Sequence, residues 1–184
     1  MIYTLPELQR AIAQDPESWR PLVFTNGCFD LLHVGHVRYL MAARQLGKRL
    51  IVGVNSDRSV HDLKPAKPGY PPRPIVPERQ RGEVLAALKP VDGIVIFDEP
   101  TAGPTLEALQ PDIYVKGGDY TIETLPETPI VQGYGGEIKL IPVEIATGTT
   151  NIIEVILGSA PAAASPDAGD GAFVADASPA KSEC

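Results

Sequence analysis

Cysteine is scarce in this 184-residue chain, which has only Cys28 and Cys184, one near each end. Two thiols are too few for a disulfide framework or a structural zinc site, so we expect a cytoplasmic protein. Long apolar runs are also missing, because no stretch approaches the roughly 18–20 residues that span a bilayer. The first twenty residues lack the basic and apolar regions of a signal peptide. We therefore expect neither a membrane span nor a secretion signal.

Positive charge is in short supply, with 16 Lys and Arg against 23 Asp and Glu and a formal net charge of −7. This balance argues against general nucleic-acid binding. The bases nevertheless gather between Arg38 and Arg81, where ten basic residues face three acids. Such a cluster is either a solvated surface or a local field for a polyanionic small molecule, and charge alone does not decide between them.

The length predicts one folded domain, over residues 1–157. The following segment, 158–184, draws 19 of its 27 residues from Ala, Ser, Pro and Gly. Because a segment of this composition cannot bury enough apolar surface to offset its ordering entropy, we predict a disordered acidic tail.

Strand-like and helix-like segments alternate along residues 1–157. The predicted strands are 22–25, 50–54, 94–97, 113–115 and 138–143. The predicted helices are 6–13, 37–46, a segment from Pro77 through Leu88, 105–109, and one that runs from Thr149 or Thr150 to Leu157. Thr4 and Glu7 have the spacing of a capping box before the first helix. This alternation predicts an α/β fold with a five-stranded parallel sheet and helices on both faces.

The most informative stretch, 25–36, leaves the first predicted strand and leads into a helix. His33 and His36 are three residues apart, so both imidazoles face the same way on the first helical turn. Gly35 between them leaves room for a bulky anion, and the helix N-terminus adds free N–H groups. Two imidazoles, a glycine and a helix start together predict a phosphate-binding cradle.

Two other interpretations of the histidine pair remain. One histidine could cap the helix while the other packs in the interior. A metal pair is also conceivable, although His-x-x-His without a third carboxylate or thiolate ligand is incomplete for zinc.

Three further motifs follow predicted strands or start a helix. Asn55-Ser56-Asp57 precedes a basic loop with Lys64, Lys116-Gly117-Gly118-Asp119-Tyr120 follows the fourth strand, and Gly148-Thr149-Thr150-Asn151 opens the last helix. Each motif also has a simpler interpretation: Lys64 could be an exposed lysine, the 116–120 motif an ordinary turn, and the 148–151 motif a helix N-cap. Because strand ends meet at one edge of a parallel sheet, we expect the motifs to converge there.

With these motifs the chain resembles the cytidylyltransferase-like nucleotidyltransferases, whose signature is His-x-Gly-His. Over about residues 20–157 it is similar to the adenylyltransferase half of the bacterial bifunctional heptose kinase/adenylyltransferases. The resemblance implies a Rossmann-like nucleotidyltransferase fold and transfer of AMP from ATP to D-glycero-β-D-manno-heptose 1-phosphate. It further implies pyrophosphate release, a divalent cation such as Mg²⁺, a possible homodimer and a separate heptose kinase upstream.

The resemblance also assigns roles to residues. Its catalytic positions are His33, His36 and Lys64. The nucleotide-binding positions it implies are Asn26, Gly27, Cys28, Phe29, Gly35, Lys116, Gly118, Asp119, Gly148, Thr149 and Thr150. Positions that it matches without a definite role, or with a role toward the acceptor, are Asp30, Asn55, Asp57 and Arg81. No metal ligand is assigned to the chain itself.

The sequence departs from the family pattern at Gly148, which stands where the family usually has Ser. A second position bears on the nucleotide: Val143 stands where relatives that act on CTP often carry Arg, which favours ATP. Two alternatives to the assignment remain. The first is an enzyme of the same fold that transfers a nucleotide from CTP or ATP to another phosphorylated acceptor, such as glycerol 3-phosphate. The second is a nucleotide-binding module without catalysis.

Cys28 is better explained as a small apolar side chain that fills space beside Phe29 than as a nucleophile.

Overall fold

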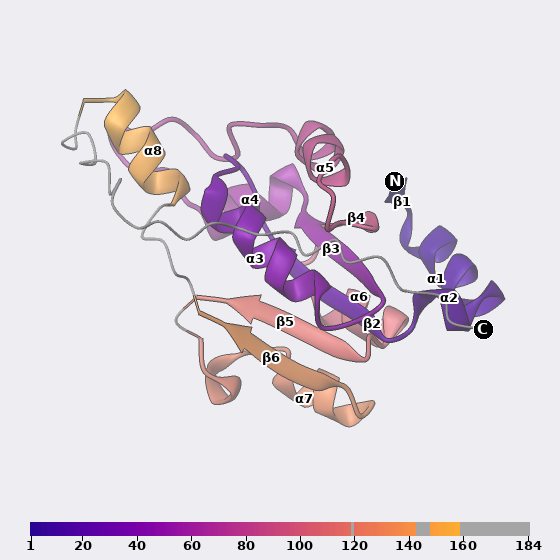
Figure 1. Cartoon of the computed structure of the whole chain (residues 1–184). Helices are drawn as coiled ribbons and strands as arrows, with labels where there is room; N and C mark the ends of the chain where they lie inside the picture. Colours follow the sequence, from indigo (N-terminus) through magenta and orange to yellow (C-terminus); the bar gives the residue numbers. More distant parts are fainter. Residues whose placement is uncertain (119, 143–147, 159–184) are drawn as a thin grey trace, which may run out of the picture.

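The computed structural model describes residues 1–118, 120–142 and 148–158 (Figure 1). The predicted tail therefore lies outside the described residues, except for Gly158, and its disorder stays a prediction. Among the described residues, no helix combines the length and the apolar character needed to cross a bilayer.

Strands and helices alternate along the described residues, as predicted, and there are more of both than the sequence indicated. The strands are β1 (Ile2–Tyr3), β2 (Leu22–Gly27), β3 (Arg49–Asn55), β4 (Gly93–Phe97), β5 (Ile113–Gly117) and β6 (Glu137–Ile141). The helices are α1 (Leu5–Gln14), α2 (Pro16–Trp19), α3 (Val34–Arg44), α4 (Asp57–Leu63), α5 (Glu78–Ala86), α6 (Gly103–Leu109), α7 (Thr128–Gly133) and α8 (Thr149–Ile156), with a 3₁₀ turn at Ile122–Thr124. The predicted capping box of α1 is confirmed, since Glu7 Oε2 accepts from the Thr4 amide at 2.8 Å.

The sheet confirms the predicted fold class and adds one strand to it. All six strands are parallel, in the order β1-β4-β3-β2-β5-β6. The extra strand is β1, whose Ile2 and Tyr3 pair with Ile94 and Val95 at the edge of the sheet. A two-residue strand has too short an alternation to be read from sequence.

The strand order reverses between β2 and β5. From β2 the chain winds through β3 to β4 on one side, and it then crosses to β5 and β6 on the other side. In open α/β sheets, ligands bind beyond the carboxyl ends of the strands at such a reversal. The arrowheads of β5 and β6 point toward the end of the molecule at which α8 lies (Figure 1).

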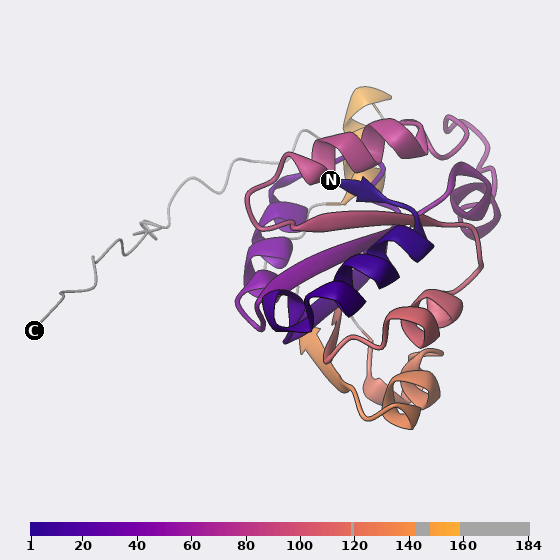
Figure 2. The ribbon, with the colours of Figure 1, turned by 90° about the vertical axis from the view of Figure 1, so that its right-hand side faces the viewer.

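Helices cover both faces of the sheet, as predicted. One core joins Leu8 of α1, Leu106 of α6 and Val131 of α7 to one face. The other core joins Leu40 of α3 and Leu85 of α5 to the opposite face. Figure 2 shows α5 above the sheet, with α6 and α7 below it. The buried sheet gives the strand ends a rigid frame.

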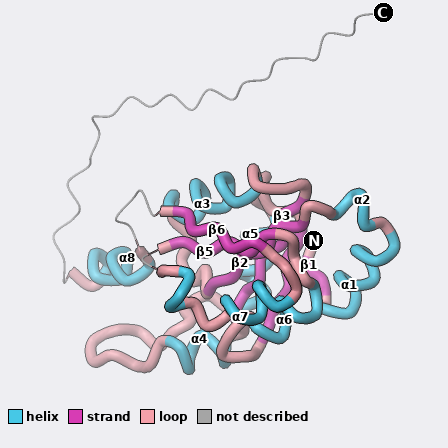
Figure 3. Tube along the Cα trace, turned by 90° about the horizontal axis from the view of Figure 1, so that it is seen from below, coloured by secondary structure: helices cyan, strands magenta, loops and turns pink. Residues whose placement is uncertain are grey.

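Helix α8 lies apart from these layers. It sits at one end of the molecule, while α1 and α2 lie at the opposite end (Figure 3). Ile153 of α8 is buried. Two side-chain hydrogen bonds among the described residues also tie the helix to the rest of the fold: Thr149 Oγ1 donates to the Leu31 carbonyl at 3.4 Å, and Tyr70 donates to Glu154 Oε1 at 2.6 Å. Tyr70 belongs to the Pro-rich segment 64–77, so this segment and α8 are joined.

Candidate active site

A cavity of about 610 Å³ opens at the reversal between β2 and β5. Seven parts of the chain line it: the end of β2 with its loop, the N-terminal half of α3, the ends of β3, α4 and β5, the connection after β4, and the segment before α7. Sequence positions more than 100 residues apart therefore meet at one edge of the sheet, where the fold predicts a ligand.

His33, Gly35 and His36 bring the N-terminus of α3 to the cavity wall. His33 is the N-cap residue in extended backbone, and its side chain makes no capping hydrogen bond. The two imidazole rings lie side by side, with centroids 3.9 Å apart and planes 30° apart. Among the described residues, neither buried Nδ1 atom has a hydrogen-bond partner. This arrangement leaves both rings with unused hydrogen-bonding capacity beside a helix N-terminus.

Burial decides the charge of the pair. Burial lowers the pKa of His36 to about 4, and its neighbour His33 adds a smaller effect in the same direction. Burial also lowers the pKa of His33. Both rings are thus neutral near pH 7, and each can donate one ring N–H to an anion.

Lys116 and Asn26 join β5 to β2 across the reversal. The Lys116 ammonium donates to Asn26 Oδ1 at 2.8 Å, and the hydroxyl of buried Tyr114 donates to the same oxygen at 2.8 Å. Burial lowers the pKa of Lys116. A desolvated cation at the floor of the cavity attracts an anionic ligand more strongly than a solvated one.

Other predicted positions line the same cavity. Gly27, Cys28 and Phe29 lie on the β2 side, with Asn55 at the end of β3 and Lys64 just after α4. Lys64 is exposed, as a lysine that reaches toward a bound ligand would be. Burial raises the pKa of the Cys28 thiol, so the thiolate is disfavoured, in keeping with a filler rather than a nucleophile.

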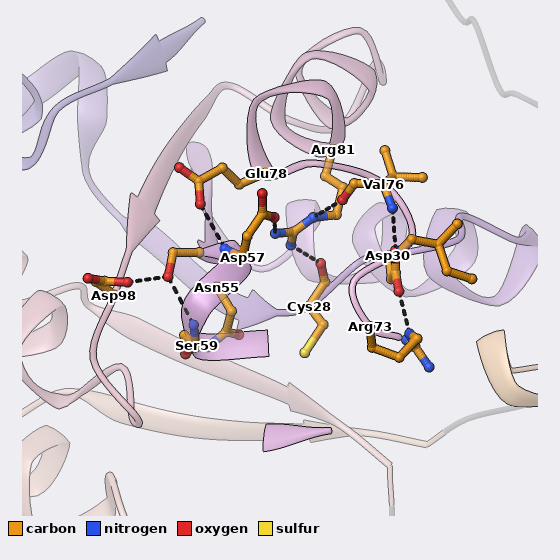
Figure 4. Close-up of polar contacts among 12 residues, drawn as sticks. Cys28, Asp30, Asn55, Asp57, Ser59, Arg73, Val76, Glu78, Arg81 and Asp98 are labelled. Atoms are coloured by element: carbon orange, nitrogen blue, oxygen red, sulfur yellow. Dashed lines mark hydrogen bonds and ion pairs between the residues drawn. The ribbon is translucent and has the colours of Figure 1, made fainter. Parts of the chain in front are cut away.

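Arg81, Asp57 and Asp30 lie behind the loop and do not line the cavity (Figure 4). The Arg81 side chain is fully buried and donates to the Val76 carbonyl at 2.8 Å, to Asp57 Oδ1 at 2.8 Å and to the Cys28 carbonyl. Its guanidinium thus fastens the loop after β2 to α5. The predicted arginine therefore supports the site from behind.

Asp30 has a related position. Its Oδ1 accepts from the amides of Ile75 and Val76 at 2.8 and 2.9 Å, and its Oδ2 pairs with Arg73. Glu78 at the start of α5 accepts from the Asp57 amide at 2.7 Å. We define Arg81, Asp57, Asp30, Arg73 and Glu78 as the brace.

Four other predicted positions, Gly118, Gly148, Thr149 and Thr150, are described by the structure and do not line the cavity. Gly118 directly follows β5 with a φ of 105°, a conformation that favours glycine. Gly148, Thr149 and Thr150 start α8 but do not line the cavity. Asp119 and Val143 lie outside the described residues.

Sequence reasoning missed the wall formed by Pro100, Thr101, Leu125, Pro126 and Glu127. Glu127 is the main omission, since it is 4% exposed and is the one carboxylate among the described residues that line the cavity. The sequence around Glu127 gave no signal of a site, because the burial of this residue depends on how the segment after β5 packs against the connection after β4.

The described residues by themselves provide no metal cage. Within 1–118, 120–142 and 148–158, no three His, Cys, Asp or Glu side chains gather closely enough to hold a metal ion. A divalent cation would fit the cavity when it is bound chiefly by substrate phosphates, as Mg²⁺ commonly is.

A parallel sheet with two paired histidines at a helix N-terminus over its reversal defines a nucleotidyltransferase. The profile of the cytidylyltransferase-like family matches residues 24–159, and the chain belongs to this family. That range contains every predicted site residue.

Within this family, the chain is similar to proteins named HldE. The chain is 51% identical over 138 residues to a "Bifunctional protein HldE" from Syntrophotalea carbinolica, a match over 75% of this chain and 27% of that protein. It is 49% identical over 150 residues to the protein of the same name from Trichlorobacter lovleyi, over 82% of this chain and 30% of that protein. The chain thus matches less than a third of the length of either.

Two solved structures show the same fold. A lipopolysaccharide core biosynthesis protein from Thermoplasma volcanium matches with a TM-score of 0.54 and 26% identity, over 68% of this chain and 97% of that one. A pantothenate synthetase from Thermus thermophilus matches with a TM-score of 0.52 and 18% identity, over 77% and 62%. The second likeness concerns the fold alone.

Proposed function

We propose that this protein transfers AMP from ATP to D-glycero-β-D-manno-heptose 1-phosphate and releases pyrophosphate. The observation that carries the proposal is the pair of neutral imidazoles, 3.9 Å apart, at the N-terminus of α3 in the cavity wall. The identities of 51% and 49% to two HldE proteins support the choice of nucleotide and acceptor.

The reaction needs positioning rather than a covalent intermediate. A phosphate oxygen of the acceptor attacks the α-phosphorus of ATP in line, the new O–P bond forms, and the bond to the β-phosphate oxygen breaks. Pyrophosphate leaves with the electron pair of that bond. Because the attacking phosphate is already ionised near neutral pH, no general base is required.

Each residue has a stated part in this proposal. His33 and His36 donate hydrogen bonds to α- and β-phosphoryl oxygens, where negative charge grows in the transition state. Lys64 reaches over the triphosphate from the end of α4, and Lys116 holds the cavity floor positive. Thr149 is held beside the loop by its hydrogen bond to the Leu31 carbonyl, and with Thr150 it would provide hydroxyl groups for the terminal phosphates. A divalent cation carried by the triphosphate would neutralise charge on the β- and γ-phosphates.

The test is pyrophosphate release with purified protein, Mg²⁺, and either ATP or CTP. We expect release with ATP plus heptose 1-phosphate, a product with the mass of ADP-heptose, and loss of turnover when a chelator removes the cation. Faster release with CTP, or with glycerol 3-phosphate as acceptor, would contradict the assignment. Binding of ATP without release for any acceptor would instead identify a nucleotide-binding module.

A further inference from the structure

Glu127 is a buried carboxylate that the proposed mechanism does not use. It directly precedes α7, its side chain is buried at the cavity wall, and the residue is 4% exposed. Its Oε1 accepts a long hydrogen bond of 3.4 Å from the Ala102 amide at the start of α6. Its Oε2 is buried and has no hydrogen-bond partner among the described residues. One carboxylate oxygen is therefore held by the fold and the other is left open.

No basic side chain neutralises this carboxylate at contact distance in the part of the chain that the structure describes: no ion pair within 4.0 Å involves Glu127. Lys116 and Tyr114 are its neighbours: the negative charge of Glu127 opposes the lowering of the Lys116 pKa by burial and adds to the raising of the Tyr114 pKa by burial. The Lys116 ammonium, however, donates to Asn26 Oδ1, and Tyr114 donates its single hydroxyl proton to the same oxygen. A buried charge with an open oxygen costs stability unless a ligand supplies the missing donor.

The cavity is thereby divided by charge. His33, His36 and Lys64 offer hydrogen-bond donors on the α3 and α4 side. Glu127 offers acceptors only, on the side of α6 and α7, and it would repel a phosphate placed against it. The ligand group that fits Glu127 is therefore an uncharged donor such as a hydroxyl group.

Two substrate sugars carry hydroxyl groups, the ribose of ATP and the sugar of the acceptor. Ala102 fastens Glu127 to the connection after β4, next to Pro100 and Thr101. Glu127 itself belongs to the segment after β5, whose first residues the resemblance assigns to the nucleotide. Its contact to Ala102 nevertheless holds the carboxylate at the connection after β4, and β3 and β2 lie between β4 and β5. This position beside the connection after β4 favours the acceptor sugar, and the affinity for ATP tests the ribose.

We propose that Glu127 accepts hydrogen bonds from hydroxyl groups of the acceptor sugar and so selects a polyhydroxylated sugar phosphate as the acceptor. This inference rests on the proposed function and specifies its acceptor subsite. Glu127 takes no part in bond making, so it is a specificity-determining residue.

The test compares Glu127→Gln with Glu123→Gln, a control for an exposed acid in the same segment after β5. Loss of a hydrogen bond to a charged acceptor predicts a rise of about 10- to 100-fold in the KM for heptose 1-phosphate. We expect kcat to stay within about threefold, because a contact remote from the reacting phosphate contributes equally to ground state and transition state. The control variant should match the wild type in every measurement.

Two further measurements separate this role from a structural one. The Kd of ATP should stay within about twofold, and the melting temperature of Glu127→Gln should equal or exceed that of the wild type, because a buried charge is removed. A lower melting temperature with both substrates weakened would overturn the inference in favour of a purely structural role. A raised Kd of ATP with unchanged acceptor KM would overturn it in favour of the ribose.

The wild-type rates keep this inference distinct from the proposed function. If the wild type turns over heptose 1-phosphate and Glu127→Gln has an unchanged acceptor KM, only the inference fails. If the wild type prefers another sugar phosphate, the acceptor assignment fails, and the same comparison is made with that sugar. If no sugar phosphate is adenylylated, both fail. Monodeoxy sugar phosphates sharpen the test, since the hydroxyl bound by Glu127 should matter to the wild type and not to the variant.

Discussion

Buried polar groups on the two sides of the loop after β2 differ in whether their hydrogen bonds are satisfied. Behind it, the brace satisfies its charges: Arg81 donates to two carbonyls and a carboxylate, and Asp30 accepts from two amides and Arg73. In front of it, His33, His36 and Glu127 each have a buried atom without a partner among the described residues. The described part of the protein thus completes its buried hydrogen bonds where they hold the loop and leaves some of them open at the cavity wall.

The difference has an energetic meaning. A satisfied buried network gives one rigid arrangement, whereas an unsatisfied buried atom costs free energy until a partner arrives. Removing a brace residue should therefore reduce stability, and removing a cavity residue should reduce function while leaving stability intact. The predictions below test this division.

The largest effect is expected for His36→Ala. Loss of one preorganised donor to the transferred phosphoryl group should lower turnover about 10²–10³-fold. His61→Ala is the matched control, because His61 is exposed on α4 and does not line the cavity. Steady-state pyrophosphate release measures both variants, and full activity of His36→Ala would remove His36 from the mechanism.

A smaller change, and one of stability, is expected for Arg81→Met. The variant leaves the carbonyls of Val76 and Cys28 without their buried donor, which should lower the free energy of unfolding by about 2–4 kcal/mol. Arg79→Met, exposed on the same helix, is the control. Urea unfolding followed by circular dichroism gives the difference, and an unchanged midpoint for Arg81→Met would contradict the brace.

The smallest effect concerns pH. The pKa of His36 is about 4 in the folded protein, against 6.5 as its ordinary value, so the unfolded chain binds more protons between these limits. The contribution of His36 to stability is therefore complete above pH 6.5 and is lost as the pH falls toward 4. Urea unfolding across this range should show a shallower pH dependence for His36→Asn.

Saturating ATP should flatten the wild-type curve in the same window, because phosphate stabilises the protonated imidazole. A wild-type curve parallel to that of His36→Asn would show that the ring is not buried as described.

The fold was predictable because its signals are local. The apolar strands and the capping box of α1 were read from short windows, and so was the glycine between two histidines. Even here the helix with His36 starts at Val34, three residues earlier than predicted, because His33 takes the N-cap position without a capping side chain. Strand β1 was not predicted, because a two-residue strand depends on its pairing with β4 and has no pattern of its own.

The site was predictable only in part. The histidines begin a helix and Lys116 lies at the end of a strand, so the topology alone brings them to the cavity. Lys64 reaches it from the C-terminal end of α4. Arg81 and Asp30 carry the charges expected of a phosphate or acceptor site, but the sequence does not show which side of the loop they occupy. Glu127 reaches the cavity because the segment between β5 and α7 packs against the connection after β4. No local sequence pattern predicts this long-range contact.

The segment between α4 and α5 is tethered at two places. Tyr70 is fastened to α8, and the residues from Arg73 to Val76 are fastened to Asp30. At its other end the segment starts from Lys64, the C-cap residue of α4, whose amide donates to the Val60 carbonyl at 2.9 Å. The ammonium can therefore be repositioned over the cavity by rotation about its own side-chain bonds, without any shift of the backbone on either side.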